Sequence, residues 1–110
     1  MNESIAQLRE VLQASRRAVV FTGAGISTES GIPDYRSPGG IWSKYRPIDF
    51  DAFVTSEDAR REYWRRKFDT YETVMQAKPN RGHQAVARLV REGKVVAVIT
   101  QNIDGLHQAS

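Results

Sequence analysis

Two short apolar runs constrain the fold of this 110-residue chain more than any other feature. AVVFT occupies residues 18–22, and KVVAVIT occupies residues 94–100. Both are rich in β-branched residues and lack the polar alternation of a half-exposed strand, which is typical of buried strands in a parallel sheet. Segments with helical periodicity lie between them. The sequence therefore predicts an α/β fold, with a parallel sheet and flanking helices.

The helical segments carry start and stop signals. Residues 3–16 place apolar residues on one face, which predicts an amphipathic helix. Ser56 is a candidate N-cap for a helix that runs to about Gln76. Asn80 follows Pro79 at the start of another helix, and Gly93 is placed to end it. The stretch 31–50 holds all but one of the prolines and predicts a long loop without helix or strand.

Composition restricts the class of protein. The chain has no cysteine, so these residues hold no disulfide and no cysteine-bound zinc. Its apolar runs are too short to cross a membrane, and we expect a cytoplasmic protein with no membrane partner. The net charge is +3, but basic and acidic residues alternate along the helices, which argues against a nucleic-acid partner. Nothing in the sequence indicates an oligomeric state, and no metal site is predicted.

A glycine loop follows the first apolar run. Gly23-Ala24-Gly25 suits a tight turn whose amide groups face an anion. A Walker loop would continue with Gly-Lys-Ser/Thr, which is absent. A dinucleotide fingerprint would place its third glycine at position 28, whereas Thr28 stands there and the glycine comes at Gly31. From these residues alone, a plain strand-to-helix turn is an equal alternative.

A polar stretch, QNID at residues 101–104, follows the second apolar run. Ligands of parallel α/β folds bind beyond the carboxyl ends of the strands. The glycine loop and QNID both come at such ends, so we expect these two stretches to share one site. On the residues alone, a turn rich in Asn and Asp remains the alternative.

GAGISTESGIPDYRS (residues 23–37) together with TQNIDGLH (residues 100–107) resembles the signatures of the sirtuin family, the NAD-dependent protein lysine deacylases. KPNRGH (residues 78–83) is similar to the family's Pro-Asn-x-x-His helix start. Tyr35 departs mildly from the commoner Phe. The resemblance covers about residues 18–109. It implies a Rossmann-like NAD-binding domain of which residues 1–110 form the N-terminal portion.

The resemblance also implies roles for individual residues. Backbone amides of the glycine loop would hold the pyrophosphate, Arg36 would pair with phosphate or ribose, and Tyr35 would cover the nicotinamide end. Trp42 would mainly anchor this loop. Asn102 and Asp104 would be catalytic, with Asp104 accepting from the carboxamide. The residues implied in cofactor binding are Gly23, Ala24, Gly25, Ile26, Ser27, Thr28, Asp34, Tyr35, Arg36, Trp42, Gln101, Asn102, Ile103 and Asp104.

The implied reaction transfers an acyl group from lysine to ADP-ribose and releases nicotinamide. It needs a general base, and the family's base lies in a His-Gly motif further along than Ser110. His107 is therefore expected to pack or hydrogen-bond, and His83 to serve a helix N-terminus. The family's structural zinc, held by four cysteines, would also lie outside residues 1–110. We accordingly expect this stretch alone to be inactive.

Other interpretations remain open. A non-catalytic nucleotide-binding fragment and a mono-ADP-ribosyltransferase would use the same loops, and an arginine-rich nucleic-acid binder would rest on charge alone. The substrate of the leading interpretation is an acyl-lysine protein or peptide. Tyr63 and Arg66 have the spacing of a pair that binds acidic acyl groups in desuccinylase-type sirtuins, although the surrounding pattern looks more like the class II branch. A surface helix is the alternative for this pair.

Overall fold

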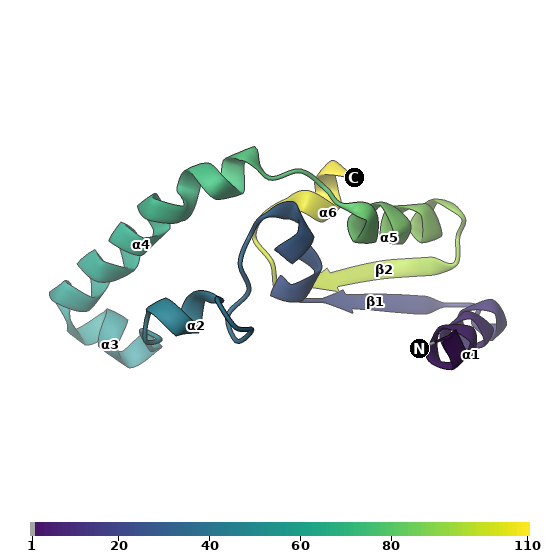
Figure 1. The fold of residues 1–110 in the computed structure, drawn as a ribbon, viewed down its shortest axis with the longest axis horizontal. Helices are drawn as coiled ribbons and strands as arrows, with labels where there is room; N and C mark the ends of the chain where they lie inside the picture. The colour runs from purple at the N-terminus through teal and green to yellow at the C-terminus, as the bar shows by residue number, and fades with distance from the viewer. Residues whose placement is uncertain (1) are drawn as a thin grey trace. The chain divides into compact units, whose positions relative to one another are not determined.

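The computed structural model describes residues 2–110, which form two compact units. The first joins the segment that ends at Gly23 with Pro79–Ser110, and the second is Ala24–Lys78. The elements in chain order are α1 (Asn2–Ala14), β1 (Ala18–Thr22), the 3-10 helix η1 (Ala24–Ser30), α2 (Ile41–Lys44), α3 (Phe50–Thr55), α4 (Glu57–Gln76), α5 (Arg81–Arg91), β2 (Val95–Thr100) and α6 (Leu106–Ala109) (Figure 1). The predicted α/β class is confirmed.

The first unit is built on β1 and β2, which pair in parallel (Figure 1). Val20 is the register partner of Val98, and Thr22 is the partner of Thr100. Because side chains alternate along a strand, the side chains of these residues lie on one face of the pair. Val98 and Thr100 both line a cavity beside α5 and α6, so this is the face that those helices cover.

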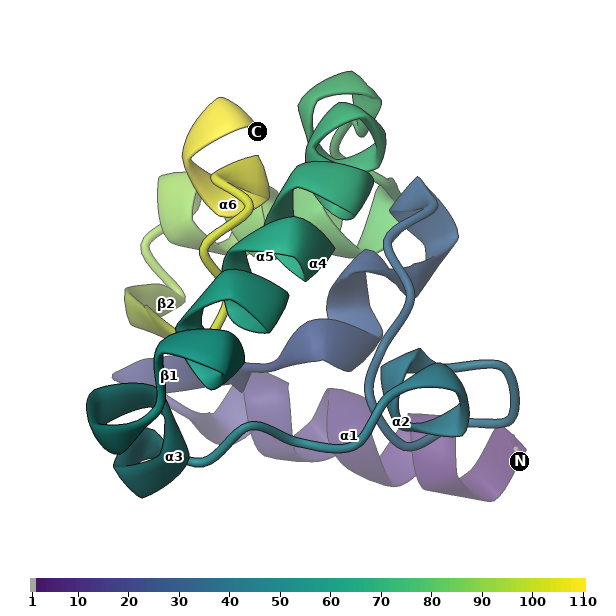
Figure 2. The ribbon, with the colours of Figure 1, turned by 90° about the vertical axis from the view of Figure 1, so that its left-hand side faces the viewer.

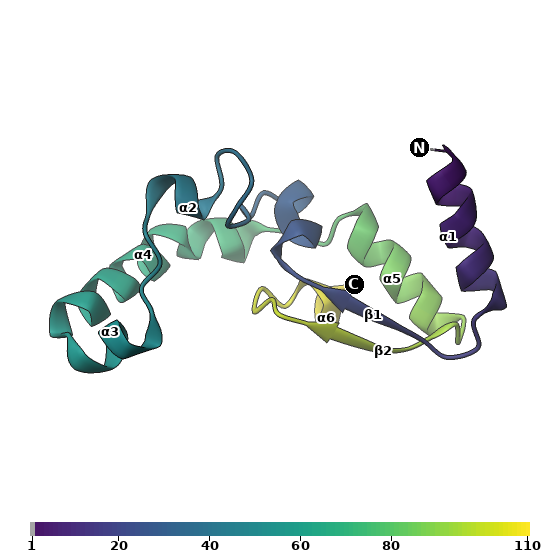
Figure 3. The ribbon, with the colours of Figure 1, turned by 90° about the horizontal axis from the view of Figure 1, so that it is seen from below.

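The other face of the strand pair is exposed. Val19 is 53% exposed, Phe21 66% and Ile99 52%. Figure 3 views the pair from below, from the side opposite α5 in Figure 1. The apolar runs predict strands that a larger sheet would bury, and exposed apolar surface where residues 1–110 stand alone; within the described residues only one face is covered, as expected. The apolar runs therefore predict where the strands lie, whereas the burial of each face depends on what packs against it.

Local signals set the bounds of α5. The Asn80 side chain accepts hydrogen bonds from the amides of Gly82 and His83, while the His83 ring accepts one from the Asn80 amide. This reciprocal pair satisfies N-terminal amides that a helix leaves without partners. Gly93 has a φ of 79° and follows the C-cap Glu92. The predicted start and stop are confirmed.

In the second unit, α3 lies beside the N-terminal part of α4 (Figures 1 and 2). Ser56 caps α4 by accepting from the Ala59 amide, as predicted. Arg60 donates to the carbonyl oxygen of Phe53 at 2.9 Å, and the rings of Phe53 and Tyr63 meet edge to face at 5.3 Å. Among the described residues, no helix combines the length and apolar character needed to cross a membrane.

The proline-rich stretch 31–50 is not purely a loop, which corrects the prediction from sequence. Pro38 and Pro47 bracket the short helix α2, and neither interrupts it. Gly40 precedes α2 at a tightly packed point of the chain. A Cβ added there would lie 2.7 Å from the carbonyl oxygen of Asp34, so the position favours glycine. The prolines delimit a helical turn here and do not exclude one.

Candidate functional site

Gly23, which follows β1, contacts the QNID stretch that follows β2. The Gln101 amide donates to the carbonyl oxygen of Thr22 at 3.1 Å. The Asn102 side chain donates from Nδ2 to the carbonyl oxygen of Gly23 at 2.9 Å. A Cβ added at Gly23 would lie 3.2 Å from Gln101 Oε1, so this close approach favours glycine. These contacts bring Gly23 together with the start of the QNID stretch, while a shared ligand site stays a prediction.

Asp104 is held by the turn that follows β2. Its Oδ1 accepts a hydrogen bond from the Leu106 amide at 3.0 Å. Gly105 between them has a φ of 73°, which allows the carboxylate to reach forward to α6. Ile103 beside it is 88% exposed. The backbone therefore fixes one oxygen of the Asp104 carboxylate, and the neighbouring residue Ile103 faces solvent.

His83 is fully buried and serves the start of α5, as predicted. Its Nδ1 accepts from the Asn80 amide at 3.1 Å, so a neutral His83 carries its proton on Nε2. Burial lowers the pKa of His83 below its ordinary value of 6.5, the nearby His107 lowers the pKa further, and Asp104 acts in the opposite direction. Protonation of Nδ1 would remove the acceptor that the Asn80 amide uses.

These contacts predict that the protein loses stability in mild acid. As pH falls through about 6.5, the unfolded chain binds a proton at His83 that the folded chain does not, so the free energy of unfolding falls with pH. The fall continues until His83 is protonated in the folded state as well. His83→Asn keeps an acceptor near Nδ1 but does not titrate. Chemical denaturation between about pH 7.5 and about pH 5.5 should show a smaller loss for His83→Asn than for wild type; an equal loss would contradict the assignment.

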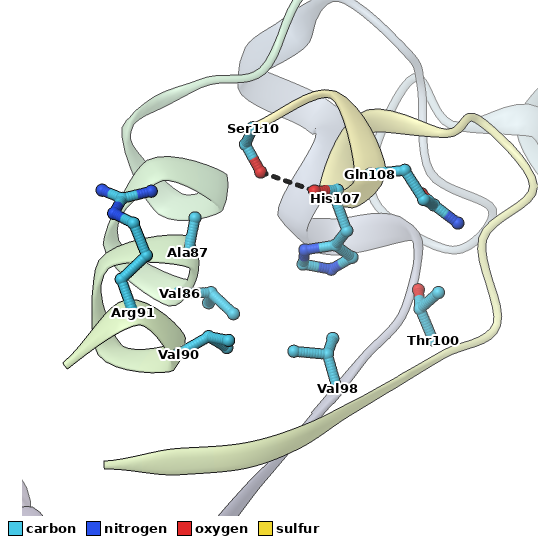
Figure 4. Close-up of a pocket in the computed structure, with 9 residues that line it drawn as sticks. All are labelled: Val86, Ala87, Val90, Arg91, Val98, Thr100, His107, Gln108 and Ser110. Atoms are coloured by element: carbon cyan, nitrogen blue, oxygen red, sulfur yellow. Dashed lines mark hydrogen bonds between the residues drawn. The ribbon is translucent and has the colours of Figure 1, made fainter. Parts of the chain in front are cut away.

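His107 projects from α6 towards the strands. Its Nε2 lies 2.8 Å from Thr22 Oγ1, and its ring packs edge to face on His83 at 5.1 Å. Figure 4 shows the ring lining a cavity between α5, β2 and α6. The volume of this cavity is about 410 Å³. The cavity is lined by Val86, Ala87, Val90, Arg91, Val98, Thr100, His107, Gln108 and Ser110. The expected structural role of His107 is confirmed by these contacts.

Sequence reasoning missed Thr22 and Thr100. Thr22 Oγ1 donates to Thr100 Oγ1 at 2.9 Å, and Thr100 Oγ1 accepts from the Asn102 amide at 3.1 Å. The signal available in the sequence was that each apolar run ends in a threonine. Two hydroxyls at paired strand ends can hydrogen-bond to each other only if the register aligns them, and one sequence does not reveal register.

The remaining predicted cofactor residues belong to the second unit and are described within it. Gly31 has a φ of 94°, a conformation that favours glycine. Asp34 accepts from the Ser37 amide at 3.1 Å and so stabilises its own turn. The Tyr35 and Trp42 rings lie 5.1 Å apart, and the Trp42 amide donates to the Tyr35 carbonyl oxygen. Trp42 thus anchors the loop as expected. Arg36 is exposed, and its role stays a prediction.

Comparison with known proteins decides the family. The Sir2 family model matches residues 23–110.

The chain belongs to the Sir2 family.

Curated relatives agree with this assignment. A protein from Bradyrhizobium diazoefficiens, named NAD-dependent protein deacetylase 1, is 58% identical over 100% of this chain and 43% of its own length. One from Rhodopseudomonas palustris, named NAD-dependent protein deacetylase, is 56% identical over 100% of this chain and 44% of its own. The Sir2 chain described here therefore spans about two fifths of the length of these relatives.

Solved Sir2 structures share its fold. A Sir2 variant described with a deacetylated p53 peptide and 3′-O-acetyl ADP ribose has a TM-score of 0.84 and 44% identity, over 94% of this chain and 42% of its own. A structure described as Sir2, p53 peptide and NAD⁺ has a TM-score of 0.77 and 42% identity, over 94% and 40%. The Rossmann-like sirtuin fold predicted from the sequence is confirmed.

In this Sir2 chain Tyr63 and Arg66 both belong to the second unit, and the contacts of Arg66 described next lie within that unit. Arg66 donates from Nε to Glu62 at 3.0 Å and from Nη1 to the carbonyl oxygen of Arg46 at 2.8 Å. Its guanidinium also lies 4.5 Å from the centre of the Tyr45 ring. These contacts give Arg66 a structural role in joining α4 to the preceding loop. Recognition of an acidic acyl group stays a prediction.

Proposed function

We propose that the full-length protein to which this chain belongs is a cytoplasmic NAD-dependent protein lysine deacylase of the deacetylase type. The observation that carries the proposal is the meeting of Gly23 with Gln101 and Asn102 at the strand ends. There Gly23 lies next to a turn that carries amide and carboxylate groups. The names of the curated relatives support the same activity.

The glycine loop fits a pyrophosphate. Gly25 is exposed, and nothing lies within 4 Å of a Cβ built on it, so a ligand can approach the backbone. η1 begins at Ala24, directly after Gly23, and helix N-termini attract anions. We propose that NAD is held by the residues predicted for it, of which Gly23, Gln101, Asn102, Ile103 and Asp104 lie in the first unit.

NAD, when bound, supplies nicotinamide as a leaving group and the ribose carbon that accepts the acyl oxygen. The residues of this chain bind and orient. Asp104 has one oxygen fixed by the Leu106 amide, and we propose that its carboxylate accepts from the carboxamide of NAD. Asn102 uses its Nδ2 on Gly23, so its side-chain oxygen is directed by that bond and can orient a ribose hydroxyl.

Neither histidine of this chain suits the general base. Nδ1 of His83 accepts within the α5 cap, and Nε2 of His107 contacts Thr22. Burial lowers the pKa of His83, so it binds protons poorly near neutral pH. We propose that the base is supplied by a His-Gly motif further along the full-length protein, where the family resemblance also places a structural zinc.

The proposed substrate is an acyl-lysine protein or peptide. The full-length protein should consume NAD and release nicotinamide only when such a peptide is present. Chromatography of nicotinamide, with and without acetyl-lysine peptide, measures this. An unacetylated peptide of the same sequence is the matched control. Nicotinamide release that does not depend on the peptide would contradict deacylation and favour glycohydrolase or ADP-ribosyltransferase activity.

A further inference from the structure

We propose that His107 is a positioning residue that sets the QNID turn through the two strand-end threonines. The residues of this chain assigned to NAD do not include His107, Thr22 or Thr100. The inference rests on the proposed function, because it concerns how the NAD-binding turn is held. All the groups involved lie in the first unit, and the hydrogen bonds between them form one continuous path.

The path begins at the paired strand ends. Thr22 and Thr100 are register partners, and their hydroxyls are 2.9 Å apart. Thr22 is only 8% exposed, so water does not readily replace its partners. Thr100 Oγ1 then accepts from the Asn102 amide at 3.1 Å. The threonine pair thus fixes the backbone at the residue where the polar turn begins.

The direction of the bonds assigns the proton on His107. A hydroxyl has a single proton to donate, and Thr22 gives its proton to Thr100. Thr100 Oγ1 in turn donates to the Thr22 carbonyl oxygen at 3.5 Å. With the hydroxyls in this arrangement Thr22 Oγ1 is an acceptor, so we assign to His107 the tautomer with a proton on Nε2, which lies 2.8 Å away. The His83 ring on α5 packs against the His107 ring edge to face.

Two further bonds extend the path to the glycine loop. The Thr22 carbonyl oxygen accepts from the Gln101 amide at 3.1 Å, and the Asn102 side chain donates to the carbonyl oxygen of Gly23. A shift of the Thr22 hydroxyl would therefore act on both predicted cofactor-binding stretches. His107 does not need to touch the cofactor in order to influence its binding.

Substitutions in the full-length protein test this path. Thr22→Val and His107→Phe keep the approximate shape of the side chain but remove the hydrogen bond between Thr22 and His107. Each should raise KM for NAD about threefold to tenfold, with a smaller change in kcat, which is the effect expected for one lost hydrogen bond. Thr22→Ser and His107→Gln keep a hydroxyl or an amide donor and should restore most of the loss. The double variant should be little worse than either single variant, because both break the same path.

The controls separate positioning from folding. Thr55→Val removes a hydroxyl that bonds only locally on α3, and should leave KM for NAD unchanged. Unfolding temperature is measured for every variant. Unchanged KM in both Thr22→Val and His107→Phe would overturn the proposal. So would a KM that rises only in proportion to lost stability and is not restored by Thr22→Ser or His107→Gln.

A measurement that does not need activity keeps this inference distinct from the proposed function. Nitrogen-15 NMR of the imidazoles should show His107 protonated at Nε2, with a signal that shifts in Thr22→Val and not in Thr55→Val. An unprotonated Nε2 would overturn the path even in an active enzyme. Absence of peptide-dependent NAD turnover in wild type would count against the proposed function, while the NMR result and the dissociation constant for NAD would still decide the role of His107.

Discussion

Asp104→Asn should lower peptide-dependent nicotinamide release by the full-length protein about 10²–10³-fold, the loss typical of removing one fixed electrostatic group. The substitution replaces an oxygen that can accept from the carboxamide by an NH₂ group that cannot. The other oxygen remains and can still accept from the Leu106 amide. The fold should therefore survive, and inhibition by added nicotinamide should weaken together with turnover.

Steady-state turnover, nicotinamide inhibition and denaturant unfolding of the same samples measure this prediction. Asp58→Asn is the matched control, because Asp58 is an exposed carboxylate in the first turn of α4. It should change activity little. If Asp104→Asn unfolds the protein and leaves nicotinamide affinity unchanged, then the carboxylate serves the start of α6 and not the cofactor.

Residues 1–110 alone should show turnover lower than that of the full-length protein by about 10²–10⁴-fold, the usual contribution of positioned acid–base groups. The reason is that His83 and His107, the two histidines of the chain, are both engaged in structural hydrogen bonds. In addition, Val19 and Phe21 expose apolar surface on the uncovered face of the sheet, which predicts low stability for the isolated stretch.

The measurement compares NAD turnover of residues 1–110 and of the full-length protein at equal concentration with acetyl-lysine peptide. Circular dichroism of both samples reports whether the shorter one is folded. Robust turnover by residues 1–110 would contradict this account. It would make His107 the leading candidate for the general base, and Thr22 the group that orients it.

Much of the fold follows from local signals that a single sequence contains. The ends of α4 and α5 are set by Ser56, Asn80 and Gly93, whose side-chain or backbone chemistry acts within a few residues. The strand positions follow from β-branched runs. What depends on distant packing was not predictable. The register that pairs Thr22 with Thr100 is one example, because it depends on residues far apart in the sequence.

In the candidate site, too, some contacts could be predicted from the sequence and others could not. The meeting of Gly23 with Asn102 could be predicted, because carboxyl ends of parallel strands meet at one edge of a sheet. The bond between Thr22 and His107 could not, since it joins residues 85 positions apart through a register that the sequence leaves unspecified. The turn formed by Asp34 likewise depends on how the proline-rich stretch folds.

The fate of the acyl group tests the central claim most directly. The full-length protein is incubated with NAD and an acetyl-lysine peptide, and the peptide, nicotinamide and nucleotide products are quantified by mass spectrometry. We expect one nicotinamide released for each lysine freed, with the acetyl group recovered on ADP-ribose. Free ADP-ribose with the peptide still acetylated, or ADP-ribose attached to protein, would contradict it.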